Sequence, residues 1–279
     1  MDIVRPEFVP DPSLSTAEME AVQRDIADAA VVTDEFAFDP EAVSLDGPAG
    51  QATLGERAGR TSAPADRPLV AGVDQAFVGD RAVSAVVVLR GREVVERVYA
   101  VEETEIPYVP GLLSFREGGA ILAAFAELAC EPDVVLVDGS GRIHYREAGL
   151  ATHIGVTLDV PTVGVAKNLL CGEPQESLDR KLPEGARVAI EADAAVETLA
   201  VSESRRADGA AAGAVIGYAV QTRQYDSDAQ SINPLIVSPG HRVSAETAAD
   251  LVLATAAGYK LPEPTRLADS YADAVKTEV

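Results

Sequence analysis

Leu69-Val70-Ala71-Gly72-Val73 is a run without charge that ends at Asp74. A short apolar run of this kind is typical of a buried strand. Two more runs with strand character follow at residues 82–89 and 93–101, and Arg90-Gly91-Arg92 between them predicts a tight turn. Three successive strands with short connections predict an antiparallel meander at the start of a sheet.

Beyond this meander, helical and strand patterns alternate. Residues 115–130 place apolar side chains on one helical face, and the apolar run 134–137 follows. A second helical stretch, residues 147–158, precedes another apolar run at 161–165. Such an alternation implies parallel pairing with a right-handed crossover, so the sequence predicts an α/β fold with a mixed sheet flanked by helices. Further strands are expected at 187–190, 214–222 and 235–237, and further helices at 244–259 and 264–276.

The N-terminal part differs in composition from the rest of the chain. A capped helix is predicted over residues 15–30, because apolar residues recur there at helical spacing behind Ser15. From about residue 39 to residue 67 the chain is rich in Gly, Pro, Ala and charge without any period, which is typical of a long loop or a disordered insertion. We therefore expect a helix and an insertion in residues 1–66, and the main domain in residues 67–279.

The charge of the chain is strongly acidic. Its 279 residues include 45 acidic and 23 basic side chains, for a formal net charge of −22. Such a load repels itself in ordinary buffer, whereas molar salt screens it to a Debye length of about 3 Å. The balance predicts a protein of a halophilic cytoplasm, with an acidic mesophilic protein as the alternative. Because this charge reflects the solvent as much as the function, it does not exclude nucleic acid as a partner.

The sequence gives no sign of secretion or of a membrane segment. Residues 1–11 mix charges with prolines, unlike a signal peptide, and no run of 18 apolar residues is free of charge. Cys130 and Cys171 are too few and too far apart for a disulfide framework or a zinc motif. We expect reduced thiols in a cytoplasmic protein without membrane contact.

Three carboxylates lie next to apolar segments, where a buried charge needs a counter-ion or another partner. Asp74 and Asp138 each follow an apolar strand, and Glu117 lies at the start of the helix between them. Buried charge is costly unless it is paired or bound to a cation, and open α/β sheets bind ligands at strand ends. Three convergent carboxylates suit Mg²⁺ or Mn²⁺ rather than zinc, and such a site can hydrolyse a phosphodiester. The alternative for each aspartate alone is a turn or a helix cap.

Basic side chains accompany these carboxylates. His144 follows Asp138 closely and can place a water or donate to a phosphate, while Lys167 ends a predicted strand and can stabilise phosphate charge. The alternatives are a loop histidine bonded to backbone and a solvated lysine. His153 is expected to pack inside its helix, and His241 to cap structure or to contact a phosphate.

The loop before the first main-domain helix is also unusual. Pro107 and Pro110 flank Tyr108 and fix its loop. A rigid aromatic wedge beside a nuclease site is what extrusion of a base requires. An ordinary rigid loop with a packed tyrosine is the alternative, and the residues of this loop alone favour it.

Several strings occur in a characteristic order along the chain. They are VAGVD at 70–74, PYVPGLLSFRE at 107–117, VDGSG at 137–141, His144, PTVGVAK at 161–167, PLIVSPGHR at 234–242 and LPEPTR at 261–266. Together they resemble the endonuclease V family of deoxyinosine-directed repair nucleases. The resemblance covers about residues 69–270 and implies an RNase H-like fold.

The resemblance also implies roles for individual residues. Asp74, Glu117 and Asp138 match the metal-binding carboxylates of the family, and His144 and Lys167 match its supporting catalytic residues. Asp269 falls where the family varies between an acid and histidine, so we hold a further carboxylate of the site and an exposed helix residue as equal alternatives. Residues matching the wedge and the hypoxanthine pocket are Tyr108 with Pro107 and Pro110, and Gly111, Leu113, Gly139 and Gly149.

The implied reaction is hydrolysis of the second phosphodiester bond 3′ to deoxyinosine, leaving 3′-hydroxyl and 5′-phosphate ends. The implied enzyme is a Mg²⁺-dependent deoxyribonuclease, with Mn²⁺ as a substitute, that acts as a monomer on single- or double-stranded DNA. Gln75 and Ser140 depart from the family pattern, but neither is a metal ligand, so the departures concern fine tuning rather than activity. Arginines near the motifs are expected to supply phosphate contacts; they are Arg116, Arg142, Arg146, Arg242 and Arg266.

Other functions remain open at this point. Some members of the family prefer inosine in RNA, and contacts to the 2′-hydroxyl would decide between the two substrates. A binding module without catalysis is disfavoured by the intact carboxylates. A halophilic phosphatase would leave both the Tyr108 wedge and the Lys167 string unexplained.

Overall fold

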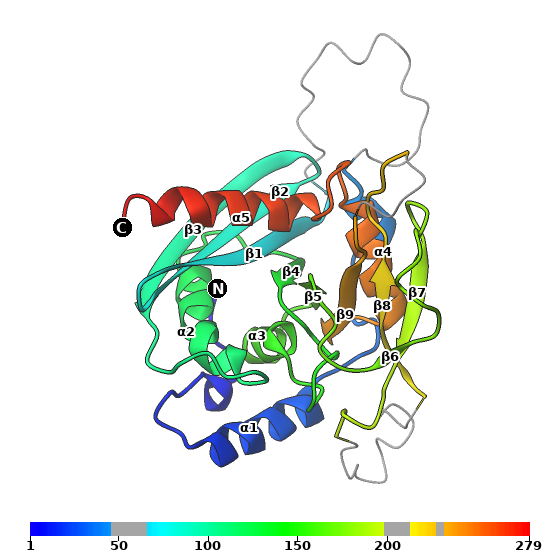
Figure 1. Ribbon diagram of the computed structural model, residues 1–279. Coiled ribbons are helices and arrows are strands. Elements are labelled where there is room, and N and C mark those ends of the chain that lie inside the picture. Colours follow the sequence, from blue (N-terminus) through cyan, green and yellow to red (C-terminus); the bar gives the residue numbers. More distant parts are fainter. Residues whose placement is uncertain (46–65, 198–212, 227–231) are drawn as a thin grey trace.

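The computed structural model describes residues 1–45, 66–197, 213–226 and 232–279 (Figure 1). Within these residues, nine strands form one sheet in the order β3-β2-β1-β4-β5-β9-β8-β7-β6. The strands are β1 (Leu69–Val78), β2 (Arg81–Arg90), β3 (Glu93–Glu103), β4 (Val134–Asp138), β5 (Thr162–Ala166), β6 (Glu173–Pro174), β7 (Arg187–Glu191), β8 (Val215–Val220) and β9 (Leu235–His241). The helices are α1 (Thr16–Ala29), α2 (Leu113–Ala126), α3 (Leu150–Leu158), α4 (Ala245–Ala254) and α5 (Glu263–Lys276), with 3-10 turns η1 (Pro6–Phe8) and η2 (Pro40–Val43).

The pairing of the strands confirms the predicted mixed α/β sheet. β1, β2 and β3 form an antiparallel meander, whereas β4 pairs in parallel with β1 and β5 pairs in parallel with β4. The remaining strands continue the sheet through antiparallel pairs, beginning with β9 against β5. The parallel centre places the carboxyl ends of β4 and β5 at one edge, next to the middle of β1.

Helices cover both faces of this sheet (Figure 1). Alternate apolar residues of β1 and β4 point into one core with α2 and α3, and the intervening residues face α4 and α5. Ala71 and Val135 lie in the first core, and Val70 and Val134 lie in the second. This two-sided burial is why the central strands appear as continuous apolar runs rather than as alternating ones.

Helix α5 approaches the sheet unusually closely. A Cβ added to Gly72 of β1 would lie 2.0 Å from the carbonyl carbon of Pro264, so only glycine allows this contact. The helix then runs beside the following residues of β1 and brings Asp269 to Asp74. A close backbone contact therefore decides which part of α5 reaches the edge of the sheet.

Helix α1 is specified locally and packs onto the loop before α2. Ser15 and Glu18 form a reciprocal capping box at its N-terminus, as the predicted start requires. Its buried side chains are Met19, Gln23 and Ile26. Met19 packs in one cluster with the loop residues Ile106 and Val109 and with Leu112 and Phe115 at the start of α2.

Several predicted boundaries were wrong by a few residues. β1 extends through Asp74 to Val78, because its whole length pairs with β2. The helix predicted from residue 147 begins only at Leu150, since Glu147 has a φ of +52° and a Cβ on Gly149 would meet the Ser140 carbonyl oxygen at 2.3 Å. The helices expected to reach residues 130 and 259 end at Ala126 and Ala254.

The predicted loop at residues 39–67 falls mostly on residues 46–65, which lie outside the described part of the chain. At its start, η2 buries Val43 against the α4 core, so this portion is structured rather than loose. Cys130 and Cys171 carry free thiols, as expected. Among the described residues, no helix has the length and apolar character needed to cross a membrane.

Candidate active site

Two aspartates meet at the edge where the parallel strands end. The parallel pairing of β1 and β4 stops at Val73 and Val137, and the next residues are Asp74 and Asp138. Asp74 lies within β1 rather than at its end, so the expectation of two strand ends was right for Asp138 alone. The Asp138 carboxyl group lies close enough to Asp74 to raise its pKa, so the two carboxyl groups are neighbours at this edge.

Burial makes this pair costly. Asp74 is 9% exposed, and its pKa is raised, first by burial and second by the charge of Asp138. Asp269, on α5, also acts on Asp74 and raises its pKa. Neighbouring carboxylates repel one another, and a bound cation would offset that repulsion. Asp269 is half-buried rather than exposed, and it does not line the cavity that contains Asp74 and Asp138.

Lys167 supplies positive charge at the same place. Its Nζ lies 2.9 Å from Oδ2 of Asp138, across the β4–β5 pair. Partial burial is the largest single influence and opposes the charged amine, but Asp138, Asp74 and Asp269 together outweigh it, and the pKa of Lys167 is raised. The lysine is therefore charged at neutral pH, with half of its side chain exposed and free to reorient toward a phosphate.

Glu117 approaches this pair from the first turns of α2. This helix packs on the face of the sheet opposite to α5. Glu117 is 8% exposed, and burial raises its pKa to about 7, with Arg116 lowering and Asp138 raising it further. Glu117, Asp74 and Asp138 line one cavity. Within the described ranges, however, no three His, Cys, Asp or Glu side chains are already gathered closely enough to hold a metal ion.

The cavity has a volume of about 390 Å³ and contains most of the predicted site. A space of this size is typical of a small-molecule or nucleobase site. Pro107 and Pro110 do not line it but flank Tyr108, which does. The predicted residues among its walls are Asp74, Tyr108, Gly111, Leu113, Glu117, Asp138, Gly139, His144, Gly149 and Lys167.

Tyr108 stands at the rim of this cavity. Its side chain is 69% exposed, so it is not the packed tyrosine of the alternative interpretation. Gly111, three residues later, has a φ of +80°, and a Cβ there would lie 3.1 Å from the ring of Tyr145. Glycine is thus required where the loop turns back toward the cavity.

His144 is held between two backbone segments. Its Nδ1 accepts a hydrogen bond from the amide of Arg146 (3.2 Å), so its Nε2 carries the proton and donates to the carbonyl of Gly111 (3.1 Å). Burial lowers its pKa to about 4, and the ring is neutral at physiological pH. This histidine therefore joins the Gly111 loop to the loop after β4.

Most of the arginines near the motifs already have carboxylate partners. Arg142 pairs with Glu147 at 2.8 Å, and Arg242 pairs with Asp159 at 2.9 Å. Arg146 and Arg266 are also paired, so phosphate contacts from these four residues require the ion pairs to open. The remaining arginine of the set, Arg116, donates to the carbonyl of Ile106.

The other two histidines lie outside the cavity walls. His153 is fully buried in α3 and bonds to the carbonyl of Phe8 at 2.6 Å, as predicted for a packed helix residue. The His241 Nδ1 accepts from the amide of Val31, and its Nε2 lies 3.1 Å from Asp159. His241 therefore has the structural role rather than the phosphate-binding one.

Several cavity residues were missed by sequence reasoning. Ser114 and Asn168 directly follow predicted site residues, so their position in the motifs was the available signal. The buried Ser114 Oγ has no hydrogen-bond partner in the described structure. The missed wall residues are Gln75, Phe77, Ser114, Ser140, Ala148, Leu150, Ala166, Asn168, Leu169 and Leu170.

The fold and the acidic cavity together define an RNase H-like nuclease. A family model described as Endonuclease V matches residues 54–270, and the chain belongs to the endonuclease V family. It is 67% identical to Endonuclease V of Haloarcula marismortui over 279 residues, covering 99% of this chain and 98% of that protein. This relative comes from a halophilic archaeon, in agreement with the acidic composition.

Solved structures give the same family. The structure of Endonuclease V from Streptomyces avermitilis is similar with a TM-score of 0.69 and 29% identity, covering 99% of each chain. Endonuclease V of Ciona intestinalis, solved in complex with a 24mer DNA containing an inosine followed by a ribo-adenosine, has a TM-score of 0.62 and 23% identity. That alignment covers 94% of this chain and 97% of the Ciona chain, and at this identity it supports the fold alone.

Proposed function

We propose that this protein is a DNA repair endonuclease that recognises deoxyinosine. It hydrolyses the second phosphodiester bond 3′ to the lesion and leaves 3′-hydroxyl and 5′-phosphate ends. The observation that carries this proposal is the cavity itself, whose walls include carboxylates, here called its acidic end, and an exposed tyrosine with neighbouring glycines, here called its recognition or aromatic end. Family membership and the inosine-containing DNA bound by the Ciona relative support the choice of substrate.

The aromatic end of the cavity suits a base turned out of the helix. Tyr108 is exposed and held in a proline-bounded loop, so it can fill the space that the flipped base leaves. Gly111, Gly139 and Gly149 line the cavity and allow backbone groups to approach the base. Extruding inosine costs a few kcal/mol at most, less than a well-paired base, which assists selection of the lesion.

The acidic end suits a divalent cation. Asp74 is buried and Asp138 is partly buried beside it, and the charge of a hard cation would relieve their mutual repulsion. We assign Asp74, Asp138 and Glu117 as the residues that would hold Mg²⁺, with Mn²⁺ as a substitute, and Asp269 as an additional carboxylate beside them. When bound, the metal would supply an activated water and charge stabilisation at the phosphate.

Basic residues complete the proposed site. Lys167 is charged and half exposed, so it can move from Asp138 to the negative charge of the scissile phosphate. His144 is neutral and bonded at both ring nitrogens, so it supports catalysis by fixing the Gly111 loop beside the carboxylates. We expect the protein to act as a monomer in the cytoplasm.

A cleavage assay tests this function. A labelled duplex with one deoxyinosine is incubated with Mg²⁺ in high KCl, beside an undamaged duplex, an inosine-containing RNA and the Asp74→Ala variant. We expect one product, cut at the second phosphodiester bond 3′ to inosine, and no product with the variant. Cleavage of RNA alone would replace DNA by RNA as the substrate, and tight binding without cleavage would leave a binding module.

A further inference from the structure

Gln23 is a buried polar residue on the apolar face of α1. Its side chain is 1% exposed and lies on the same face as Met19 and Ile26. A glutamine buried this completely needs partners for its amide. Its Nε2 donates to the carbonyl oxygen of Gly111 at 2.7 Å, and its Oε1 accepts from Nη1 of Arg146 at 3.2 Å. Gln23 therefore joins two loops of the cavity that are far from it in sequence.

The carbonyl of Gly111 is the point where these contacts converge. It accepts hydrogen bonds from Gln23 and from Nε2 of His144, one from each side of the loop. The backbone amide of Arg146 donates to the same histidine ring, while its guanidinium reaches Gln23. The four residues form a closed ring of contacts beside the cavity, and α1 supplies one member.

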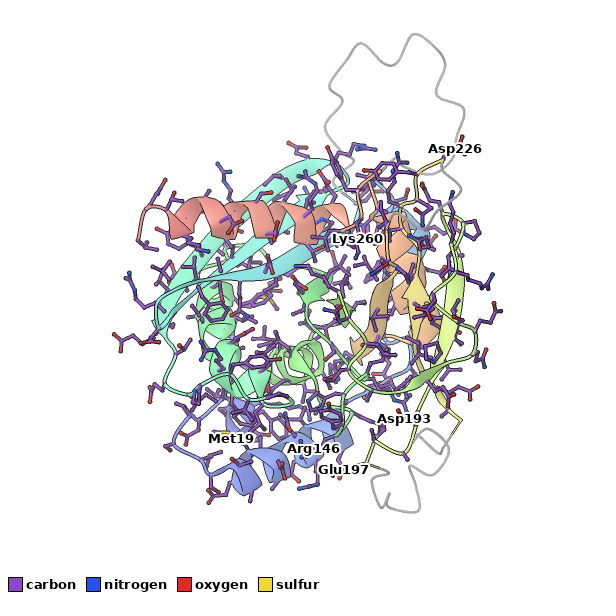
Figure 2. The ribbon with its side chains drawn as sticks, viewed as in Figure 1. Met19, Arg146, Asp193, Glu197, Asp226 and Lys260 are labelled. Carbon is purple, nitrogen blue, oxygen red and sulfur yellow. The ribbon has the colours of Figure 1, made fainter. Side chains whose placement is uncertain are left out.

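Ion pairs hold α1 against this ring. Arg146 pairs with Glu20 of α1 at 2.6 Å and with Glu197 at 3.3 Å, and Arg24 of α1 pairs with Glu197 at 2.9 Å. Figure 2 shows Arg146 and Glu197 close together beside the helix, with Met19 on the same helix. The apolar packing of Met19 onto the loop and these charges fix where Gln23 sits.

We infer that Gln23 is a positioning residue for the base pocket: it fixes the Gly111 carbonyl and His144, and thereby the loop that carries Tyr108. The inference rests on the proposed function for its substrate, but it concerns α1, which lies outside the residues matched by the family model. The N-terminal helix then takes part in recognition although none of its residues lines the cavity.

Three variants of the full-length protein separate this role from folding. Gln23→Leu removes both hydrogen bonds, and Gln23→Glu keeps the acceptor for Arg146 while removing the donor to Gly111. Gln221→Leu is the matched control, because Gln221 is fully buried and its Nε2 bridges two other carbonyls, those of Arg223 and Ile232. It lies outside the cavity walls.

Two measurements in high KCl test whether Gln23 positions the Gly111 carbonyl and His144. Single-turnover cleavage of the inosine duplex should fall about ten-fold in both Gln23 variants, the size expected for one buried hydrogen bond, with DNA affinity unchanged. Because the chain has 3 histidines, ¹⁵N NMR can resolve the ring of His144, and its signals should shift in both variants without DNA. The control should change neither reading.

The possible results remain distinguishable. Unshifted His144 signals in the Gln23 variants, or cleavage equal to that of Gln221→Leu, would overturn the positioning role. A wild-type protein that fails to cut inosine-containing DNA or RNA would refute the proposed function instead, and the NMR signals would still decide the contact between Gln23 and the His144 ring.

Discussion

The two ends of the cavity are built in different ways. The acidic end stands on the central strands, where Asp74 and Asp138 follow paired backbone and their positions are set by the sheet. The recognition end consists of loops, and its Gly111 carbonyl depends on side chains from α1 and from the loop after β4. The comparison indicates that strand pairing sets the positions of the carboxylates. The position of the Gly111 loop is instead set by side chains that are distant in sequence.

The largest expected effect belongs to the acidic end. Asp74→Asn should lower cleavage about a thousand-fold, the upper range for removal of one preorganised electrostatic contact. The same change should stabilise the metal-free protein at neutral pH, because the pKa of Asp74 is raised in the folded state and the buried carboxylate disfavours folding once pH exceeds its unfolded value of 3.8. Cleavage rates and thermal unfolding with a chelator in high KCl check both. A variant that is less stable and still active would refute this description of the acidic end.

The stability of the protein is expected to depend on pH through His153 of α3. Burial lowers the pKa of His153 to about 4 from 6.5, so the folded protein binds fewer protons than the unfolded chain between these values. Stability from this residue is complete above pH 6.5 and is lost as pH falls toward 4, by about 3 kcal/mol. Denaturant unfolding across this pH range measures it, and His153→Gln should reduce the slope, while the contribution of His144, whose pKa burial also lowers to about 4, remains. An unchanged slope in the variant would assign the loss to other groups.

The contact between α5 and β1 can be broken without touching the cavity walls. Gly72→Ala should destabilise the protein by about 1–3 kcal/mol, because the new Cβ overlaps the Pro264 backbone. Gly119→Ala is the control: it lies in α2 with no atom within 4 Å of the new Cβ, and should stabilise by about 0.5–1 kcal/mol. Urea titration gives both values. Equal effects would mean that the close approach of α5 is not required.

The smallest effect is expected for the wedge. Tyr108→Ala should leave stability unchanged, because the side chain is 69% exposed. It should lower cleavage of the inosine duplex about ten-fold, since stacking of a base on an aromatic ring is worth about 1–3 kcal/mol. Tyr225→Ala, another exposed tyrosine, serves as a control. A full rate in the Tyr108 variant would remove the wedge from the mechanism.

The strand and helix pattern itself predicted the carboxylates, whereas the residues of the recognition end were assigned through the family resemblance. Asp138 was predictable because it ends a short apolar strand, and the strand–helix–strand order placed its strand beside that of Asp74. The contact of Asp269 with Asp74 was not predictable, because it depends on how closely α5 packs on Gly72. Gln23 had a signal, a polar residue on an apolar helical face, but no local pattern connects it with Gly111, 88 positions away.

One measurement tests the separation of the two ends most directly. Binding and single-turnover cleavage of inosine-containing and undamaged duplexes are compared for the wild-type protein, Asp138→Asn and Tyr108→Ala, with Mg²⁺ in high KCl. We predict that Asp138→Asn still prefers inosine-containing DNA but does not cut it, and that Tyr108→Ala cuts slowly with a reduced preference. Loss of the preference in Asp138→Asn, with the preference intact in Tyr108→Ala, would contradict the assignment of chemistry to the carboxylates and of recognition to the Tyr108 loop.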